Sequence, residues 1–196
     1  MTISTNRALK EWAVAVNALE AGQTILLMRK GGIREEKGRF QVQDKQILLY
    51  PTYEHQKTHL LKPEYARQVA PVPSLWHPEN VRIGSWAEIT DVFTVTEEAA
   101  IAQLLPYHIW GEQLARDRFN WKPRQPLYLL LLRVYKLSTH STIPYAQEYG
   151  GCKSWIELLE SISLEGSIAV LNDSEYRDRV KAIHQIVEQY DIQAVK

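Results

Sequence analysis

A charged loop that follows a buried apolar run is the first place in the sequence to look for chemistry. Residues 28–40 read MRKGGIREEKGRF, and positions 29 to 39 carry five cations against two anions. No helical pattern follows the glycines, and neither of the common phosphate-loop spacings is present. The loop is therefore predicted to contact an anionic ligand through its cations rather than to cradle phosphate with its backbone. The predicted phosphate contacts are Arg29, Lys30, Arg34 and Arg39.

The same loop contains Glu35-Glu36-Lys37, which fits the Glu-x-Lys half of a restriction-type nuclease site. In such a site an acidic residue helps to hold magnesium while the lysine orients water. That motif normally lies on a strand flanked by apolar residues, whereas here it lies among charges. A solvated turn is the favoured interpretation, and Glu35 and Glu36 are kept as candidate catalytic residues.

Two histidines four residues apart raise the question of a metal site. On a helix, His55 and His59 would lie on one face, with Glu54 beside them, within reach of one metal ion. Thr58 and Pro63 interrupt the helical pattern, and the H-E-x-x-H motif is absent. No metal and no cofactor are therefore expected. These three residues remain the candidate metal ligands, and His55 is also a candidate catalytic residue.

Aromatic residues beside cations form a third feature. Flat rings stack on exposed bases and nearby cations hold phosphates, which is what recognition of single-stranded nucleic acid requires. Trp121 lies in such a stretch, since residues 116–124 carry four cations against one anion. The rings predicted to stack on a base are Tyr53, Trp86 and Trp121.

Composition limits the class of protein. A chain of 196 residues that is 45% apolar is one globular domain, or one domain with a small appendage. Lys plus Arg equal Asp plus Glu at 23 each, so no global basic field indicates nucleic acid. A single cysteine excludes an internal disulfide and a cysteine-based zinc cluster. The N-terminus lacks the apolar core of a signal peptide and no stretch approaches the ~20 apolar residues of a membrane span, so a cytoplasmic protein is expected.

The elements that position these residues can be predicted from hydrophobic periodicity and from capping signals. Helices are expected at 7–21, 97–105, 106–119 and 153–160, with a final helix that Asp173 or Ser174 caps. Strands are expected at 24–28, 40–42, 47–50, 86–95, 127–137 and 166–171. The unbroken apolar run of the strand at 127–137 predicts burial on both faces.

This order of elements predicts an α+β fold. The sheet is expected to be a β-barrel or a mixed sheet with flanking helices. Residues 1–137 form the expected core. Residues 138–196 form a mostly helical extension, either a small subdomain or a part of the same domain that packs onto the sheet.

Several segments together resemble an uncharacterised bacterial family that is catalogued as a domain of unknown function and is frequent in cyanobacteria. They are Trp12 with residues 22–33, residues 49–56, residues 133–135 and residues 149–155. The resemblance covers nearly the whole chain, and it implies no activity.

A second resemblance concerns the fold. A helix that ends in Gly22, followed by a strand that carries Arg29, is similar to the start of ASCH domains in the PUA-like superfamily. Their motif is G-x-K-x-x-E-x-R, and Thr24 and Leu27 replace its Lys and its Glu. The resemblance covers residues 7–137 and implies a PUA-like β-barrel with inserted helices. Members of that superfamily mostly bind RNA or modified bases, and a few are hydrolases.

The leading functional hypothesis is that a PUA-like domain binds RNA, DNA or a nucleotide-like ligand, without any association with a membrane. A first alternative is a metal-dependent hydrolase or nuclease. Its residues would be Glu35, Glu36, Glu54, His55 and His59. A second alternative is a non-catalytic interaction protein that forms a homodimer through one face of the C-terminal helix. That face consists of Val180, Ile183, Val187 and Tyr190.

Overall fold

One mixed sheet organises the chain in the structure, a computed structural model that describes residues 3–29, 35–36, 39–40, 45–120, 127–151, 153–190 and 193–194. The main sheet has eight strands over these ranges, in the order β2-β7-β6-β5-β1-β8, with β10 added beside β6 and β9 beside β7. The strands are β1 (Ser4–Trp12), β2 (Leu26–Arg29), β5 (Gln46–Thr52), β6 (Asn80–Val95), β7 (Leu127–Pro144), β8 (Trp155–Ser163), β9 (Ile168–Ala169) and β10 (Gln193–Ala194). A separate hairpin pairs β3 (Glu35–Glu36) with β4 (Arg39–Phe40).

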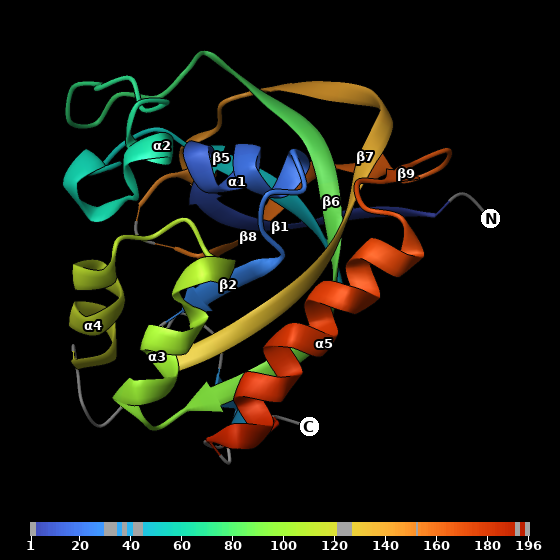
Figure 1. Cartoon of the computed structure of the whole chain (residues 1–196). Helices are drawn as coiled ribbons and strands as arrows, with labels where there is room; N and C mark the ends of the chain where they lie inside the picture. The colour runs from blue at the N-terminus through green and yellow to red at the C-terminus, as the bar shows by residue number, and fades with distance from the viewer. Residues whose placement is uncertain are drawn as a thin grey trace.

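Helices cover one face of this sheet, with α1 and the long α5 lying across it (Figure 1). The α-helices are α1 (Ala13–Glu20), α2 (Pro63–Ala66), α3 (Glu98–Leu104), α4 (Glu112–Asn120) and α5 (Asp173–Gln189). Three short 3-10 helices are η1 (Thr58–Leu60), η2 (Leu105–Tyr107) and η3 (Gln147–Tyr149). In the described part of the chain, no helix has both the length and the apolar character that crossing a membrane requires.

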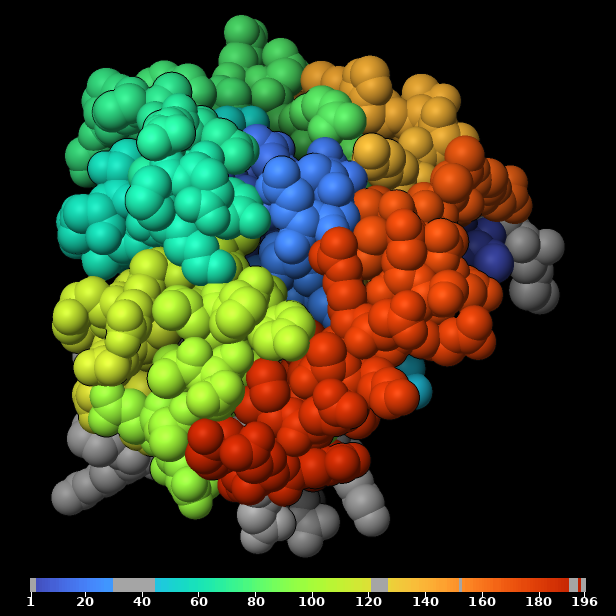
Figure 2. Space-filling view, in the orientation of Figure 1, coloured from blue at the N-terminus to red at the C-terminus, as the bar shows by residue number. Residues whose placement is uncertain are grey.

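Two clusters of buried side chains lie against the sheet. The larger includes residues of α1, α3, α5 and the strands they cover. At the surface, α1 (blue) lies beside the orange-red C-terminal helix (Figure 2). The smaller includes residues of β1, β5, β6 and β8. The apolar run 127–132 of β7 is buried at every position, so the expected burial on both faces is confirmed.

The prediction of an α+β fold is confirmed in its mixed-sheet form. β1 and β5 run parallel, whereas the other pairings of the main sheet are antiparallel. The sheet is open across the described residues, because β2 pairs only with β7 and β8 pairs only with β1. The closed-barrel alternative is therefore wrong.

Two predicted helices are strands or partly strands. The segment expected to be helical over residues 7–21 is extended up to Trp12, and only Ala13–Glu20 form a helix. The segment expected to be helical over 153–160 is strand β8. In both cases the cause is tertiary pairing, since β1 and β8 hydrogen-bond to each other from opposite ends of the chain. Long-range pairing here overrides local periodicity.

The C-terminal helix forms as expected, but its apolar face is not a free surface. Asn172 and Glu175 make a capping box at its N-terminus, so the N-cap is Asn172 and neither of the predicted caps, Asp173 or Ser174. Ile183 is fully buried and Val187 is nearly so, and both belong to the larger core cluster. The helix face that was predicted to form a homodimer therefore packs into the core of the same chain, and the prediction that this face mediates self-association is wrong.

Gly22, which follows α1, allows the cost of a strained backbone and of a close contact to be measured. Its φ of +66° is a left-handed conformation, and an added Cβ would lie 2.9 Å from Leu171 Cδ2. We expect Gly22→Ala to lower the free energy of unfolding by about 1–3 kcal/mol, because an L-residue is strained there and the contact must shift. Gly151→Ala is the matched control, since Gly151 has a φ of +73° and no atom within 4 Å of an added Cβ. Urea unfolding of both variants measures the difference, and equal losses would show that the Leu171 contact costs nothing.

Candidate functional site

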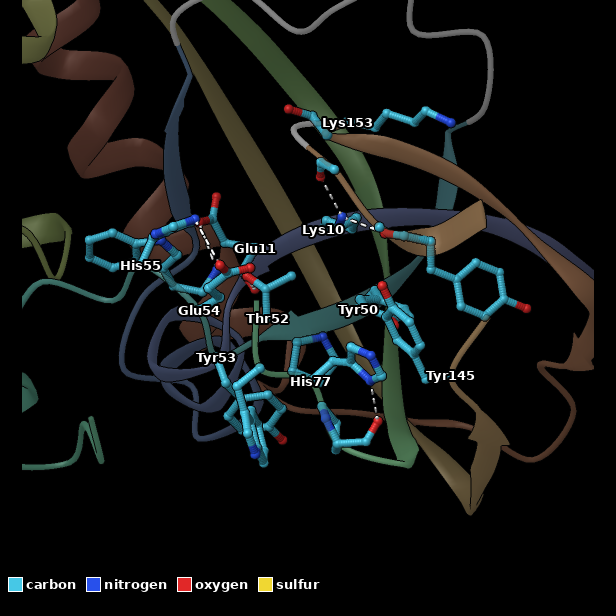
Figure 3. A pocket seen from close by; sticks show the side chains of 18 of the residues that line it. Lys10, Glu11, Tyr50, Thr52, Tyr53, Glu54, His55, His77, Tyr145 and Lys153 are labelled. Atoms are coloured by element: carbon cyan, nitrogen blue, oxygen red, sulfur yellow. Dashed lines mark hydrogen bonds and ion pairs between the residues drawn. The ribbon is translucent and has the colours of Figure 1, made fainter. Parts of the chain in front are cut away.

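A pocket of about 530 Å³ lies where the ends of β1, β2 and β5 meet two loops (Figure 3). Its size falls within the range of about 300–1,000 Å³ that is usual for small-molecule sites. The lining segments are residues 10–12, 50–55, 75–78, 149–151 and 153–154, together with Arg29, Arg118 and Tyr145. Segments from most of the chain therefore converge on one cavity.

A buried ion pair between Glu11 and Arg29 lies at this pocket. Arg29 Nη1 donates to Glu11 Oε2 at 2.6 Å, and the two side chains are 10% and 5% exposed respectively. The other carboxylate oxygen, Oε1, accepts from the backbone N–H of Trp12 at 2.9 Å. The Thr52 hydroxyl donates to the backbone carbonyl of Glu11 at 3.0 Å. The first two bonds fix the carboxylate and the third holds the backbone of Glu11, while the ion pair neutralises Arg29 locally.

Arg118 brings a second guanidinium to the pocket from the last turn of α4. Its Nη1 donates to the backbone carbonyl of Met28 at 2.7 Å, and its Cζ lies 4.9 Å from the centroid of the Trp110 ring. Burial lowers the pKa of Arg118, with Glu11 opposing and Arg29 adding to that effect. Among the described residues, no ion pair joins this guanidinium to a carboxylate.

Two lysines lie on another wall of the pocket. Lys10 Nζ donates to the carbonyls of Tyr149 and Gly151, at 2.5 and 2.9 Å (Figure 3). These bonds tie β1 to the loop that follows η3. Lys153, which is exposed, follows on the same loop. The wall therefore combines a lysine held in place with one that extends towards solvent.

Aromatic rings line the opposite rim. The rings of Tyr53 and Trp76 meet edge to face with centroids 5.8 Å apart. The rings of His77 and Tyr145 are stacked, with centroids 3.5 Å apart and planes 11° from parallel. Behind them lies Tyr50, whose hydroxyl has a pKa raised by burial. The rim thus presents several flat faces to one cavity.

The loop over residues 74–77 is held to the rim by the carboxylate of Glu54. Glu54 Oε1 accepts from the backbone N–H of Leu75 at 2.6 Å and lies 3.2 Å from His55 Nε2. Both His55 and Leu75 have a φ of +64°, in a region that residues other than glycine adopt rarely. Such backbone strain is typical of ligand sites, because the surrounding contacts must maintain it.

The structure gathers four of the predicted site residues at this pocket. Arg29, Tyr53, Glu54 and His55 all line it. Trp86 does not, because its ring is buried and stacks on Tyr135, with centroids 4.3 Å apart. The rings of Trp76, His77 and Tyr145, and the charged groups Glu11 and Arg118, were not predicted as site residues.

Other predicted residues lie elsewhere or outside what the structure describes. Lys30, Arg34 and Trp121 are outside the described residues. The backbones of Glu35, Glu36 and Arg39 form the β3–β4 hairpin, and their side chains are also outside the described part. The four-residue spacing of the two histidines is not helical, since His55 is in a turn and exposed His59 is in η1. No three His, Cys, Asp or Glu side chains gather to hold a metal ion in the ranges described.

Comparison with known proteins identifies one family and one group of structures. A family model described as "Domain of unknown function (DUF1802)" matches residues 8–182. No curated protein matches the chain. Among solved structures, ASCH from Zymomonas mobilis shares 12% identity over 89% of this chain and 93% of its own, with a TM-score of 0.47. A serine-to-alanine variant of that protein shares 13% identity over 91% and 98% of the two chains, with a TM-score of 0.45. The family model thus confirms the resemblance to a family of unknown function that was noted from the sequence.

Proposed function

The chain belongs to the DUF1802 family, and from the geometry of its pocket we propose that it binds a nucleotide-like ligand, either a free nucleotide or an exposed base of a nucleic acid. The observation that supports this most is the meeting of an aromatic rim and a cationic wall in one cavity. A base needs a flat face to stack on, and its phosphate needs nearby positive charge.

The rim supplies the stacking surface. Trp76 is 39% exposed although it is a large ring, so part of the side chain remains accessible to a ligand. Tyr53 meets it edge to face and limits its rotation. Stacking of one base on an aromatic side chain contributes about 1–3 kcal/mol to binding. That contribution is large enough for one ring to decide the affinity.

The charges around the cavity favour an anion. Four cations line it, namely Lys10, Arg29, Arg118 and Lys153, against two carboxylates, Glu11 and Glu54. Because the protein as a whole has a formal net charge of zero, this excess is local. A local positive potential inside a cleft raises the rate and affinity of anion binding.

Removing the stacking ring should weaken binding without unfolding the protein. We expect Trp76→Ala to raise the Kd for adenosine 5′-monophosphate by about 5- to 100-fold, which corresponds to the loss of one stacked base. Trp76→Phe should recover most of this loss, because it keeps a flat face. Isothermal titration at low and high salt, with nucleosides, nucleotides and short RNA and DNA strands, measures both effects.

Leu159→Ala is the control outside the pocket, since Leu159 is 71% exposed on β8. It should leave every Kd unchanged. If no nucleoside, nucleotide or strand binds to the unaltered protein, or if Trp76→Ala binds as tightly as the unaltered protein, the proposed function is wrong.

A further inference from the structure

We propose that Arg118 anchors a terminal phosphate, so that the ligand of the pocket is a phosphomonoester: a nucleoside monophosphate or a phosphorylated strand end. The part of this proposal that concerns the base rests on the proposed function. The part that concerns the phosphate can be tested independently of it. It adds a residue that the charge pattern did not identify as part of a site, and it narrows the class of ligand.

The position of Arg118 is the first argument. Its guanidinium lies against the carbonyl of Met28 and over the ring of Trp110, and these two residues are 0% and 1% exposed. The core therefore backs the guanidinium, while Arg118 also lines the pocket. A phosphate that contacts Arg118 from the pocket therefore lies at the side of the cavity nearest the core.

The charge balance is the second argument. Glu11 is the buried carboxylate that stabilises Arg118 electrostatically, yet both of its oxygens are already engaged by Arg29 and by the backbone N–H of Trp12. The described part of the chain offers Arg118 a single hydrogen bond, to Met28. A guanidinium has five N–H donors in a planar fork. A half-buried cation with unused donors is suited to an anion with several oxygens.

The kind of phosphate follows from the surroundings. A phosphodiester needs room for an ester group on both sides of the phosphorus. Buried Met28 and Trp110 lie behind the guanidinium, so a phosphate reaches Arg118 from the pocket side alone. We infer that a phosphate at the end of a molecule fits this one-sided approach better than a phosphate within a strand. A phosphomonoester has one ester link and three free oxygens, and it carries close to two negative charges at neutral pH. It can approach with its ester link towards the rim and its free oxygens towards Arg118.

The unaltered full-length protein provides a test that needs no substitution. We expect adenosine 5′-monophosphate to bind about 10- to 100-fold more tightly than adenosine, and also than the methyl ester of the same phosphate, because the charge-assisted hydrogen bonds require free oxygens. A 5′-phosphorylated tetranucleotide, compared with its unphosphorylated form, separates a strand end from a free nucleotide. Isothermal titration at constant ionic strength gives all five affinities.

Substitution then assigns the effect to one residue. Arg118→Gln should reduce the Kd ratio between adenosine and its monophosphate to about one, while the affinity for adenosine itself remains. Arg116→Gln is the matched control, because Arg116 lies on the same helix, is half exposed and pairs with Glu112 across one turn. It should keep the full ratio. Arg118→Lys keeps the charge but loses the planar fork, so its ratio should be intermediate.

The outcomes separate the two proposals. Equal binding of adenosine, its monophosphate and the methyl ester would overturn the phosphate anchor and leave base recognition intact. Binding of ribose 5-phosphate that depends on Arg118, without binding of adenosine, would support the anchor and overturn base recognition. A preference for the monophosphate that persists in Arg118→Gln would place the phosphate at the lysine wall and overturn the role of Arg118.

Discussion

Replacing Glu11 with Gln is expected to lower the free energy of unfolding by about 3–5 kcal/mol, the usual cost of removing one partner of a buried ion pair. Glu11 is 5% exposed and its carboxylate pairs with Arg29 at 2.6 Å. It also acts on Arg118, whose pKa it raises against the effect of burial. Without its charge, two partly buried guanidiniums, those of Arg29 and Arg118, lack a compensating carboxylate. Urea unfolding at pH 7, followed by tryptophan fluorescence, measures the loss through the midpoint at constant m-value.

Two further variants show whether the loss comes from the buried charge. Glu157→Gln removes the partner of Arg7 at the surface, where the two side chains are 43% and 61% exposed, so it should cost less than about 1 kcal/mol. The double variant with Arg29→Met should be more stable than Glu11→Gln alone, because it removes one of the unpaired charges. A loss in Glu11→Gln as small as that in Glu157→Gln would contradict the structural role assigned to this carboxylate.

Acid should destabilise the protein through His108. This side chain is 2% exposed, and within the described residues neither ring nitrogen has a hydrogen-bond partner in good geometry. Burial, assisted by the nearby charge of Lys62, lowers the pKa of His108 to about 3. Below the usual pKa of about 6.5 the unfolded chain therefore binds a proton that the folded chain excludes, and stability falls with falling pH. The expected contribution is a loss of about 3 kcal/mol between pH 6.5 and pH 4.

Substitution of His108 isolates this contribution. His108→Leu should flatten the dependence of unfolding free energy on pH in that interval, since no proton is then taken up at this position. Exposed His59 provides the control, and His59→Gln should leave the pH dependence as it is. Denaturant unfolding at half-unit steps of pH gives the slopes. Identical slopes in His108→Leu and the unaltered protein would show that the buried imidazole is not responsible.

The elements that the sequence predicts best are those that depend on neighbouring residues. The run 127–132 has the continuous apolar character of a strand buried on both faces, and β7 confirms it. The final helix carries its own start signal in the capping box of Asn172 and Glu175. In both cases the deciding interactions lie within a few positions of each other.

The elements that sequence reasoning missed depend on distant partners. β1 and β8 are strands because Ala8 pairs with Ile156 and Leu9 with Trp155. Nothing near either segment indicates that pairing, while the apolar residues around Leu9 and Trp12 also fit a helical period. The helical periodicity near Leu9 and Trp12 is present in the sequence, but the backbone hydrogen bonds between β1 and β8 stabilise the extended conformation more.

The same distinction applies to the pocket. Tyr53, Glu54 and His55 were found because they are adjacent in the sequence and chemically conspicuous. Arg118 was counted only in a run of surface charges, because its burial depends on Trp110 and on β2. Trp86 shows the opposite error: a ring that looked available for stacking is already stacked, on Tyr135.

The place of β1 in the sheet also affects the newly made chain. Ala8 pairs with Leu48 on one side and with Ile156 on the other. Ribosomes add roughly 5–20 residues per second, so roughly 5–20 s separate the synthesis of these two partners. During that interval one edge of the first strand has no neighbour, and an unpaired strand edge invites other chains. We therefore expect a nascent protein of this topology to depend on chaperones until β8 has been made.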